Sequence, residues 1–84
     1  MKYLVLTRRG PSFDPDVIPA HYEFLDELRH RGLLEQAGPF TDKTGGAYVL
    51  NADSLNEAIA LADQDPLQAR RCSTIEVLEW NSQE

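Results

Sequence analysis

Apolar residues are spaced in two ways along this chain, and the two spacings alternate. Apolar residues that are continuous or fall at every second position favour a strand, whereas repeats of three and four residues favour a helix. In chain order, the spacing and the turn residues predict a strand at 2–7, a helix at 18–31, strands at 33–40 and 47–51, a helix from 54 to about 63, and a last strand at 74–80.

Residues with special backbone preferences support these boundaries. Gly32 supplies a stop for the first helix, and Ser54 begins a capping-box pattern for the second. Pro39 lacks a backbone N–H, so the strand that contains Gly38 and Pro39 belongs at a sheet edge. The order of elements predicts an α+β domain of the ferredoxin-like β-α-β-β-α-β type, a four-stranded antiparallel sheet with two helices on one face.

The length of the chain predicts a single domain over residues 1–84. A domain of this size buries only roughly 60–65% of the surface of its unfolded chain, so its core is thin. The first strand is apolar on both sides, which is typical of a central strand covered on both faces. Because the helices cover one face, we expect a second copy to cover the other, giving a homodimer described as a dimeric α+β barrel.

Charge and composition argue against several classes of partner. The formal net charge is −6, which repels phosphate backbones, so no nucleic-acid partner is expected. The longest apolar run near the start, residues 3–6, is too short for a signal peptide or a membrane span. The single cysteine, Cys72, fits a reducing compartment. We therefore expect a cytoplasmic protein without a membrane partner.

His21 is the most informative candidate for a functional side chain. On a helical wheel it falls between Leu25 and Leu28, inside the apolar stripe of the first helix. It is either a core histidine that bonds a backbone group or a general acid or base in a pocket. His30 lies on the opposite side of the helix, so the two histidines cannot share a metal ion, and no metal is expected.

Asp65 also has two readings. It precedes Pro66, which suits the N-cap of a short helix, and it could equally orient His21 through a carboxylate-imidazole hydrogen bond. Arg8 and Arg9 end the first strand and could hold an anionic substrate, although adjacent arginines are often solvated or paired. Gly45 and Gly46 lack the pattern of a phosphate or dinucleotide loop, and no cofactor is expected.

Four segments, taken in order, resemble the YciI-like, or YCII-related, domain family: Pro19-Ala20-His21, Gly32-Leu33-Leu34, Ala37-Gly38-Pro39-Phe40 and residues 63–67. The resemblance implies a dimeric α+β barrel with an active site at a His/Asp pair, here His21 and Asp65. It also implies that the turn at Gly38 and Pro39 lines the same pocket. One related domain belongs to an enzyme that removes chloride from a chlorinated hydroxyquinone, but function transfers poorly between members of a fold.

This chain departs from the family pattern at two positions. Ile18 stands where a basic residue often precedes Pro-Ala-His, and Leu67 stands where an aromatic residue often follows Asp-Pro. Both changes alter the polarity of the pocket, so they leave the substrate class open.

The leading hypothesis is a cofactor-independent small-molecule enzyme of the lyase or isomerase type. In it His21 moves a proton, Asp65 orients His21, and Gly38, Pro39 and Arg8 contact the substrate. The alternatives are a non-catalytic small-ligand-binding or accessory module and a purely structural dimer. Catalysis needs a His21 ring that solvent can reach, whereas a structural role needs a sealed ring.

Overall fold

The computed structural model describes residues 1–83 and contains the predicted order of elements. The elements are β1 (Lys2–Arg9), η1 (Pro15–Val17), α1 (Ile18–His30), β2 (Leu34–Pro39), β3 (Gly45–Asn51), α2 (Leu55–Ala62), α3 (Pro66–Ala69) and β4 (Ser73–Trp80). The largest differences from the predicted boundaries are at the end of β1 and the start of β3, which each extend two residues further. The predicted α+β ferredoxin-like fold is confirmed.

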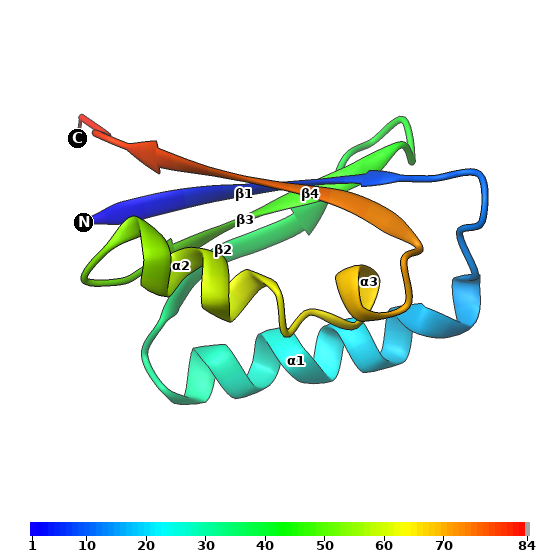
Figure 1. Cartoon of the computed structure of the whole chain (residues 1–84), viewed down its shortest axis with the longest axis horizontal. Helices are drawn as coiled ribbons and strands as arrows, with labels where there is room; N and C mark the ends of the chain where they lie inside the picture. Colours follow the sequence, from blue (N-terminus) through cyan, green and yellow to red (C-terminus); the bar gives the residue numbers. More distant parts are fainter. Residues whose placement is uncertain (84) are drawn as a thin grey trace.

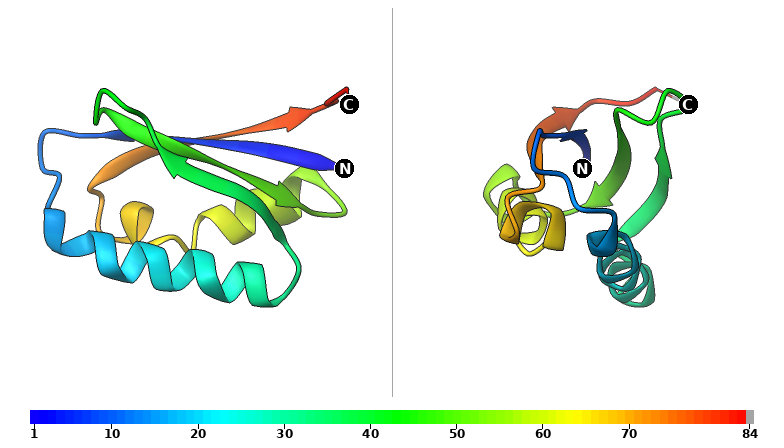
Figure 2. Two further views of the ribbon diagram at one scale, coloured as in Figure 1. Left: turned by 180° about the vertical axis from the view of Figure 1, so that it is seen from behind. Right: turned by 90° about the vertical axis from the view of Figure 1, so that its right-hand side faces the viewer.

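The strands form one antiparallel sheet in the order β2-β3-β1-β4. The strand β1 is central, as its apolar faces predicted, and β2 lies at an edge, as Gly38 and Pro39 predicted. The helices all lie on one side of the sheet, and no helix or strand of residues 1–83 covers its other face (Figure 1; Figure 2). Each candidate functional residue can therefore be assigned to the helix-covered face or to the open face.

The main core fills the space between the sheet and the helices. In the central strand, Tyr3 and Val5 point toward this core, where they belong to the same buried cluster as Leu25 and Leu28 of α1. Full burial of one such side chain stabilises a fold by roughly 1.5–3 kcal/mol. A smaller cluster comprises Val17, Leu67 and Cys72, with Phe13 and Ile75 packed against it.

Local hydrogen bonds fix the ends of the helices. Ser54 Oγ accepts from the backbone N–H of Glu57 at 3.1 Å, which confirms the predicted cap of α2. Gly32, with a φ of 73°, follows the end of α1, in the left-handed conformation that glycine adopts at little cost. Helix α1 has no side-chain cap, since the chain enters it directly from the 3-10 turn η1.

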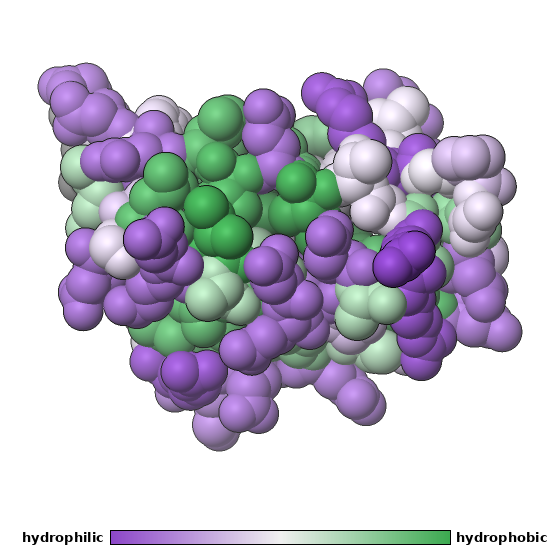
Figure 3. Space-filling model, in the orientation of Figure 1, coloured by the Kyte–Doolittle hydropathy of each residue, from purple (hydrophilic) through white to green (hydrophobic). Residues whose placement is uncertain are grey.

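The molecular surface keeps several large apolar side chains partly exposed. Leu78 and Trp80 of β4 are 40% and 43% exposed, and Leu55 and Ile59 of α2 are also exposed. Figure 3 shows apolar side chains gathered over the region of α2 and β4, with hydrophilic side chains around them. On the open face of the sheet, Leu4 and Leu6 are only half-buried within the single chain.

Two glycines that lie close together on β2 and β3 give a matched test of strand packing. A Cβ added at Gly46 would lie 2.6 Å from the carbonyl oxygen of Gly38, whereas a Cβ at Gly38 would meet nothing within 4 Å. We expect Gly46→Ala to lower the free energy of unfolding by roughly 1–3 kcal/mol. Gly38→Ala should change it by about 0.5 kcal/mol or less. Denaturant unfolding checks both, and equal midpoints for the two variants would contradict the close approach of the strands.

Candidate active site

A pocket opens between the helices and the covered face of the sheet. It has about 540 Å³ of space, counted with its open mouth. Its walls come from β1, β2, β3, α1, α3 and the first residue of β4, so segments from the whole length of the chain contribute to it. The fold therefore forms a concave site between the covered face of the sheet and α1.

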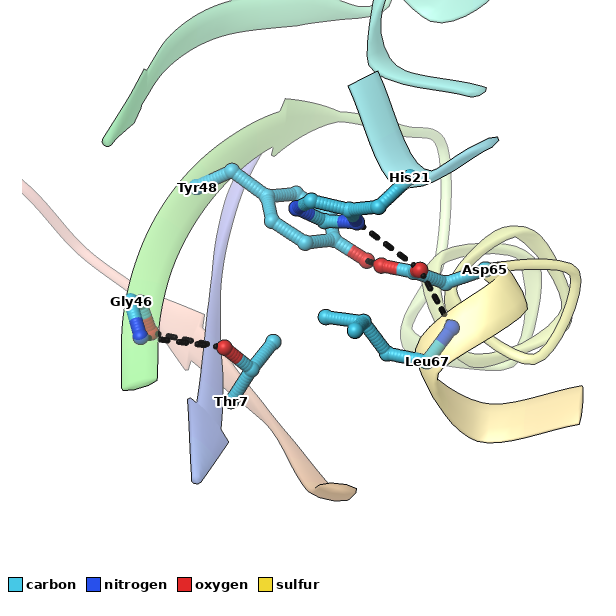
Figure 4. Close-up of polar contacts among 6 residues, drawn as sticks. All are labelled: Thr7, His21, Gly46, Tyr48, Asp65 and Leu67. Carbon is cyan, nitrogen blue, oxygen red and sulfur yellow. Dashed lines mark hydrogen bonds and ion pairs between the residues drawn. The ribbon is translucent and has the colours of Figure 1, made fainter. Parts of the chain in front are cut away.

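His21 and Asp65, which are 44 residues apart in sequence, meet at one side of this pocket. His21 Nδ1 lies 2.9 Å from Asp65 Oδ1, so the contact predicted from the sequence is present. The His21 side chain is 16% exposed and its ring lines the pocket, whereas the Asp65 side chain is fully buried. Figure 4 shows the imidazole of His21 and the phenol ring of Tyr48 both directed toward the carboxylate.

The carboxylate of Asp65 accepts three hydrogen bonds from three different elements. Oδ1 accepts from His21 Nδ1–H and from the backbone N–H of Leu67 at 2.9 Å, and Oδ2 accepts from the hydroxyl of Tyr48 at 3.0 Å. The bond to Leu67 is the N-cap of α3. The same side chain therefore caps α3 and also contacts His21.

Tyr48 is a member of the site that the sequence analysis did not identify. It lies in the middle of β3 and is buried, with its ring 6.1 Å from that of His21 and 6.4 Å from that of Phe24. Burial, and then the negative charge of Asp65 and the hydrogen bond to it, raise the pKa of Tyr48 above its ordinary value. The hydroxyl therefore stays protonated and donates. The only signal in the sequence was a tyrosine among apolar neighbours, because a buried phenol needs a polar partner.

The hydrogen bond to Asp65 determines which nitrogen of His21 carries the proton and which is left with a lone pair. An ionised carboxylate only accepts hydrogen bonds, so Nδ1 must carry the proton and donate it to Oδ1. In the neutral ring, Nε2 then carries the lone pair. No group within residues 1–83 makes a hydrogen bond to Nε2. The arrangement can therefore take up a proton from a molecule in the pocket.

The other predicted site residues lie in two places. Gly38 and Pro39 line the pocket. Arg8 does not, because side chains alternate along β1 and Arg8 falls on the open face, while Thr7 and Arg9 face the pocket. The structure thus does not bring Arg8 to His21, and Arg9 is the arginine at this site.

Among residues 1–83, no three His, Cys, Asp or Glu side chains are grouped so that they could hold a metal ion. No helix in the same range is long and apolar enough to cross a membrane.

Comparison with known proteins places these features in a family. The chain is 47% identical over 78 residues to the uncharacterized protein YjpA of Bacillus subtilis (strain 168), covering 93% of this chain and 92% of that protein. Among solved structures, it resembles the 5-chloro-2-hydroxyhydroquinone dehydrochlorinase TftG from Burkholderia phenoliruptrix AC1100 in complex with 2,5-dihydroxybenzoquinone. The TM-score is 0.78 at 19% identity, covering 99% of this chain and 96% of that one, and shows a common fold.

The family model of the YCII-related domain matches residues 1–81, which is nearly the whole chain. This match and the similarity to YjpA confirm the resemblance that the sequence motifs indicated. The chain belongs to the YCII-related domain family.

Proposed function

We propose that the protein is a cofactor-independent enzyme that moves a proton on a small molecule, with His21 as the general acid or base. The observation that carries this proposal is the orientation of one side chain. His21 is held at Nδ1 by the buried carboxylate of Asp65, and its ring lines a pocket that solvent can reach. A sealed core histidine would not need such an opening. The dehydrochlorinase of similar fold supports the proposal that this architecture can host an enzyme.

In the proposed reaction, Nε2 of His21 takes a proton from a C–H or O–H bond of the substrate, and the electron pair of that bond stays on the substrate. In an isomerisation, the pair forms a new double bond and the imidazolium returns the proton to a different atom. In an elimination, a leaving group departs with its own bonding electrons. General acid-base catalysis of this kind typically contributes roughly 10²–10⁴-fold to the rate.

Asp65 and Tyr48 have supporting roles in this proposal. The carboxylate of Asp65 stabilises the imidazolium that forms when His21 takes the proton. Tyr48 donates to the second carboxylate oxygen and keeps the carboxylate in the orientation that His21 needs. Gly38 and Pro39 form part of the wall against which a substrate would lie.

We also propose that two copies pair through the open faces of their sheets, as the family resemblance implies. Leu4 and Leu6 of the central strand, with Leu78 and Trp80 of β4, supply the apolar surface for this contact. Exposed apolar area of this kind favours association in water.

The role of His21 is tested by exchange of substrate protons with deuterated solvent. A panel of small molecules that includes 5-chloro-2-hydroxyhydroquinone is incubated with the protein in D2O and followed by proton NMR. We expect the protein to catalyse the loss of a proton signal from the compound that is its substrate. The variant His21→Gln should slow this exchange by about 100-fold or more, since it removes the base. His30→Gln, at an exposed position of the same helix, is the matched control and should exchange at the parent rate. Equal rates for the two variants would refute the proposal.

The orienting role of Asp65 is tested by the tautomer of His21. In the parent protein, ¹⁵N NMR of the imidazole nitrogens should show Nδ1 protonated and Nε2 unprotonated, because Asp65 accepts from Nδ1. In Asp65→Asn, the side-chain amide can donate to Nδ1, so the population of the other tautomer should rise. His30 provides an internal control in each spectrum. An unchanged His21 tautomer in Asp65→Asn would show that the carboxylate does not set the ring state.

The proposed pairing is tested by light scattering. We expect a mass of about two chains at micromolar concentration, and we expect Leu4→Asp to shift the mass toward one chain, because an unpaired carboxylate in an apolar interface costs several kcal/mol. Glu23→Gln, which changes a charge at an exposed position of α1 on the other side of the sheet, should leave the dimer intact. A parent protein with the mass of one chain would contradict the pairing.

A further inference from the structure

The hydroxyl of Ser73 is a polar group whose partner is missing from the described part of the chain. Ser73 is 8% exposed. Among the buried side-chain oxygen and nitrogen atoms of residues 1–83, Ser73 Oγ is the one that has no hydrogen-bond partner. Buried hydroxyls are normally hydrogen-bonded, so one that is not requires a reason. Ser73 also lines the same pocket as His21. A molecule in the pocket could therefore supply the missing partner.

Arg9 lines the same pocket as Ser73 and provides a positive charge. In the ladder between β1 and β4, Arg9 is directly opposite Ser73, which places both side chains on one face of the sheet at neighbouring positions. The guanidinium lies over the ring of Phe13, 4.3 Å from its centroid. No carboxylate among residues 1–83 forms an ion pair with Arg9. Its planar face is thus held by an aromatic ring, while its N–H edge is available to an anion.

The polar groups of the pocket are of two kinds. His21 is a titratable side chain, and Ser73 and Arg9 supply hydrogen-bond donors. Apolar side chains, Phe13, Ile18 and Leu25, line the same space. A protein with a net charge of −6 repels anions in general, so an anionic ligand needs a local cation of this kind.

We propose that Ser73 and Arg9 form a subsite for an anionic oxygen, and that the ligand of this pocket is a small organic acid with an apolar body. Ser73 Oγ–H and the guanidinium donate to the anionic oxygen, and the apolar body lies against Phe13, Ile18 and Leu25. The inference rests on the proposed function only in that the same pocket would present the ligand to His21. Binding of the anion itself needs no proton transfer.

Benzoate is a suitable probe, with benzamide as its uncharged counterpart of the same shape. The full-length ¹⁵N-labelled protein is titrated with each compound in 0.15 M salt, which screens distant charges. We expect benzoate to shift the amide signals of Arg9, Ser73 and Gly46, and to bind at least about fivefold more tightly than benzamide, because charge-assisted hydrogen bonds are the stronger kind.

Two adjacent arginines give a matched pair of variants. Arg9→Gln should weaken benzoate binding by about tenfold, because it removes the charge at the subsite. Arg8→Gln makes the same change of net charge on the opposite face and should weaken binding by less than about twofold. The serine is tested in the same way. Ser73→Ala should weaken benzoate binding by roughly fivefold. Ser73→Cys, with a weak donor of similar size, is a second variant that should also weaken binding. Dispersed amide spectra check that each variant is folded.

The possible outcomes separate this inference from the proposed function. Equal weakening by Arg8→Gln and Arg9→Gln would show general attraction by charge and overturn the subsite. Equal affinities for benzoate and benzamide, or unaltered binding in Ser73→Ala, would overturn it as well. Benzoate carries no proton that His21 needs to move, so its binding does not depend on catalysis. Selective loss in Arg9→Gln would support the subsite even if the exchange experiment on His21 failed.

Discussion

The arrangement of the site depends on the hydrogen bonds that the buried carboxylate of Asp65 accepts. Removing a charged carboxylate from water is costly unless hydrogen bonds replace those lost to solvent. Here the replacements come from α1 through His21, from β3 through Tyr48, and from the first turn of α3 through Leu67. Because one carboxylate needs all three donors, the three elements are fixed relative to one another at the wall of the pocket.

The Asp65 carboxylate contributes to the stability of the fold and also takes part in the proposed function. The N-cap of α3 and the partner of His21 are the same side chain, so the two interpretations drawn from the sequence are not alternatives. The hydrogen bonds leave His21 with Nδ1 occupied and its ring at the pocket surface, 16% exposed. A histidine buried only for packing would have no need of a pocket beside it. The donors that hold Asp65 thus also position the carboxylate that contacts His21.

The side chains of β1 point alternately to the two faces of the sheet, one lining the pocket and the other open. Thr7 and Arg9 face the pocket, and the hydroxyl of Thr7 also bonds both backbone groups of Gly46, which ties β1 to the β3 wall of the site. Leu4 and Leu6 face the open side. A shift of one residue in register would exchange these sets, so the pairing of β1 with β3 and β4 decides which arginine reaches the pocket.

The sequence by itself determined the elements, because their signals are local. The capping box at Ser54, the stop at Gly32 and the Asp65-Pro66 helix start each act within one turn of the chain, and all three lie where the structure has them. The motifs around His21 and Asp65 also indicated the family. Only the tertiary structure decided that Tyr48 shares the carboxylate and that Arg9, rather than Arg8, lines the pocket. Those facts depend on strand register and on the packing of α1 and α3 against the sheet, which arise from contacts between residues far apart in the chain and leave no local pattern.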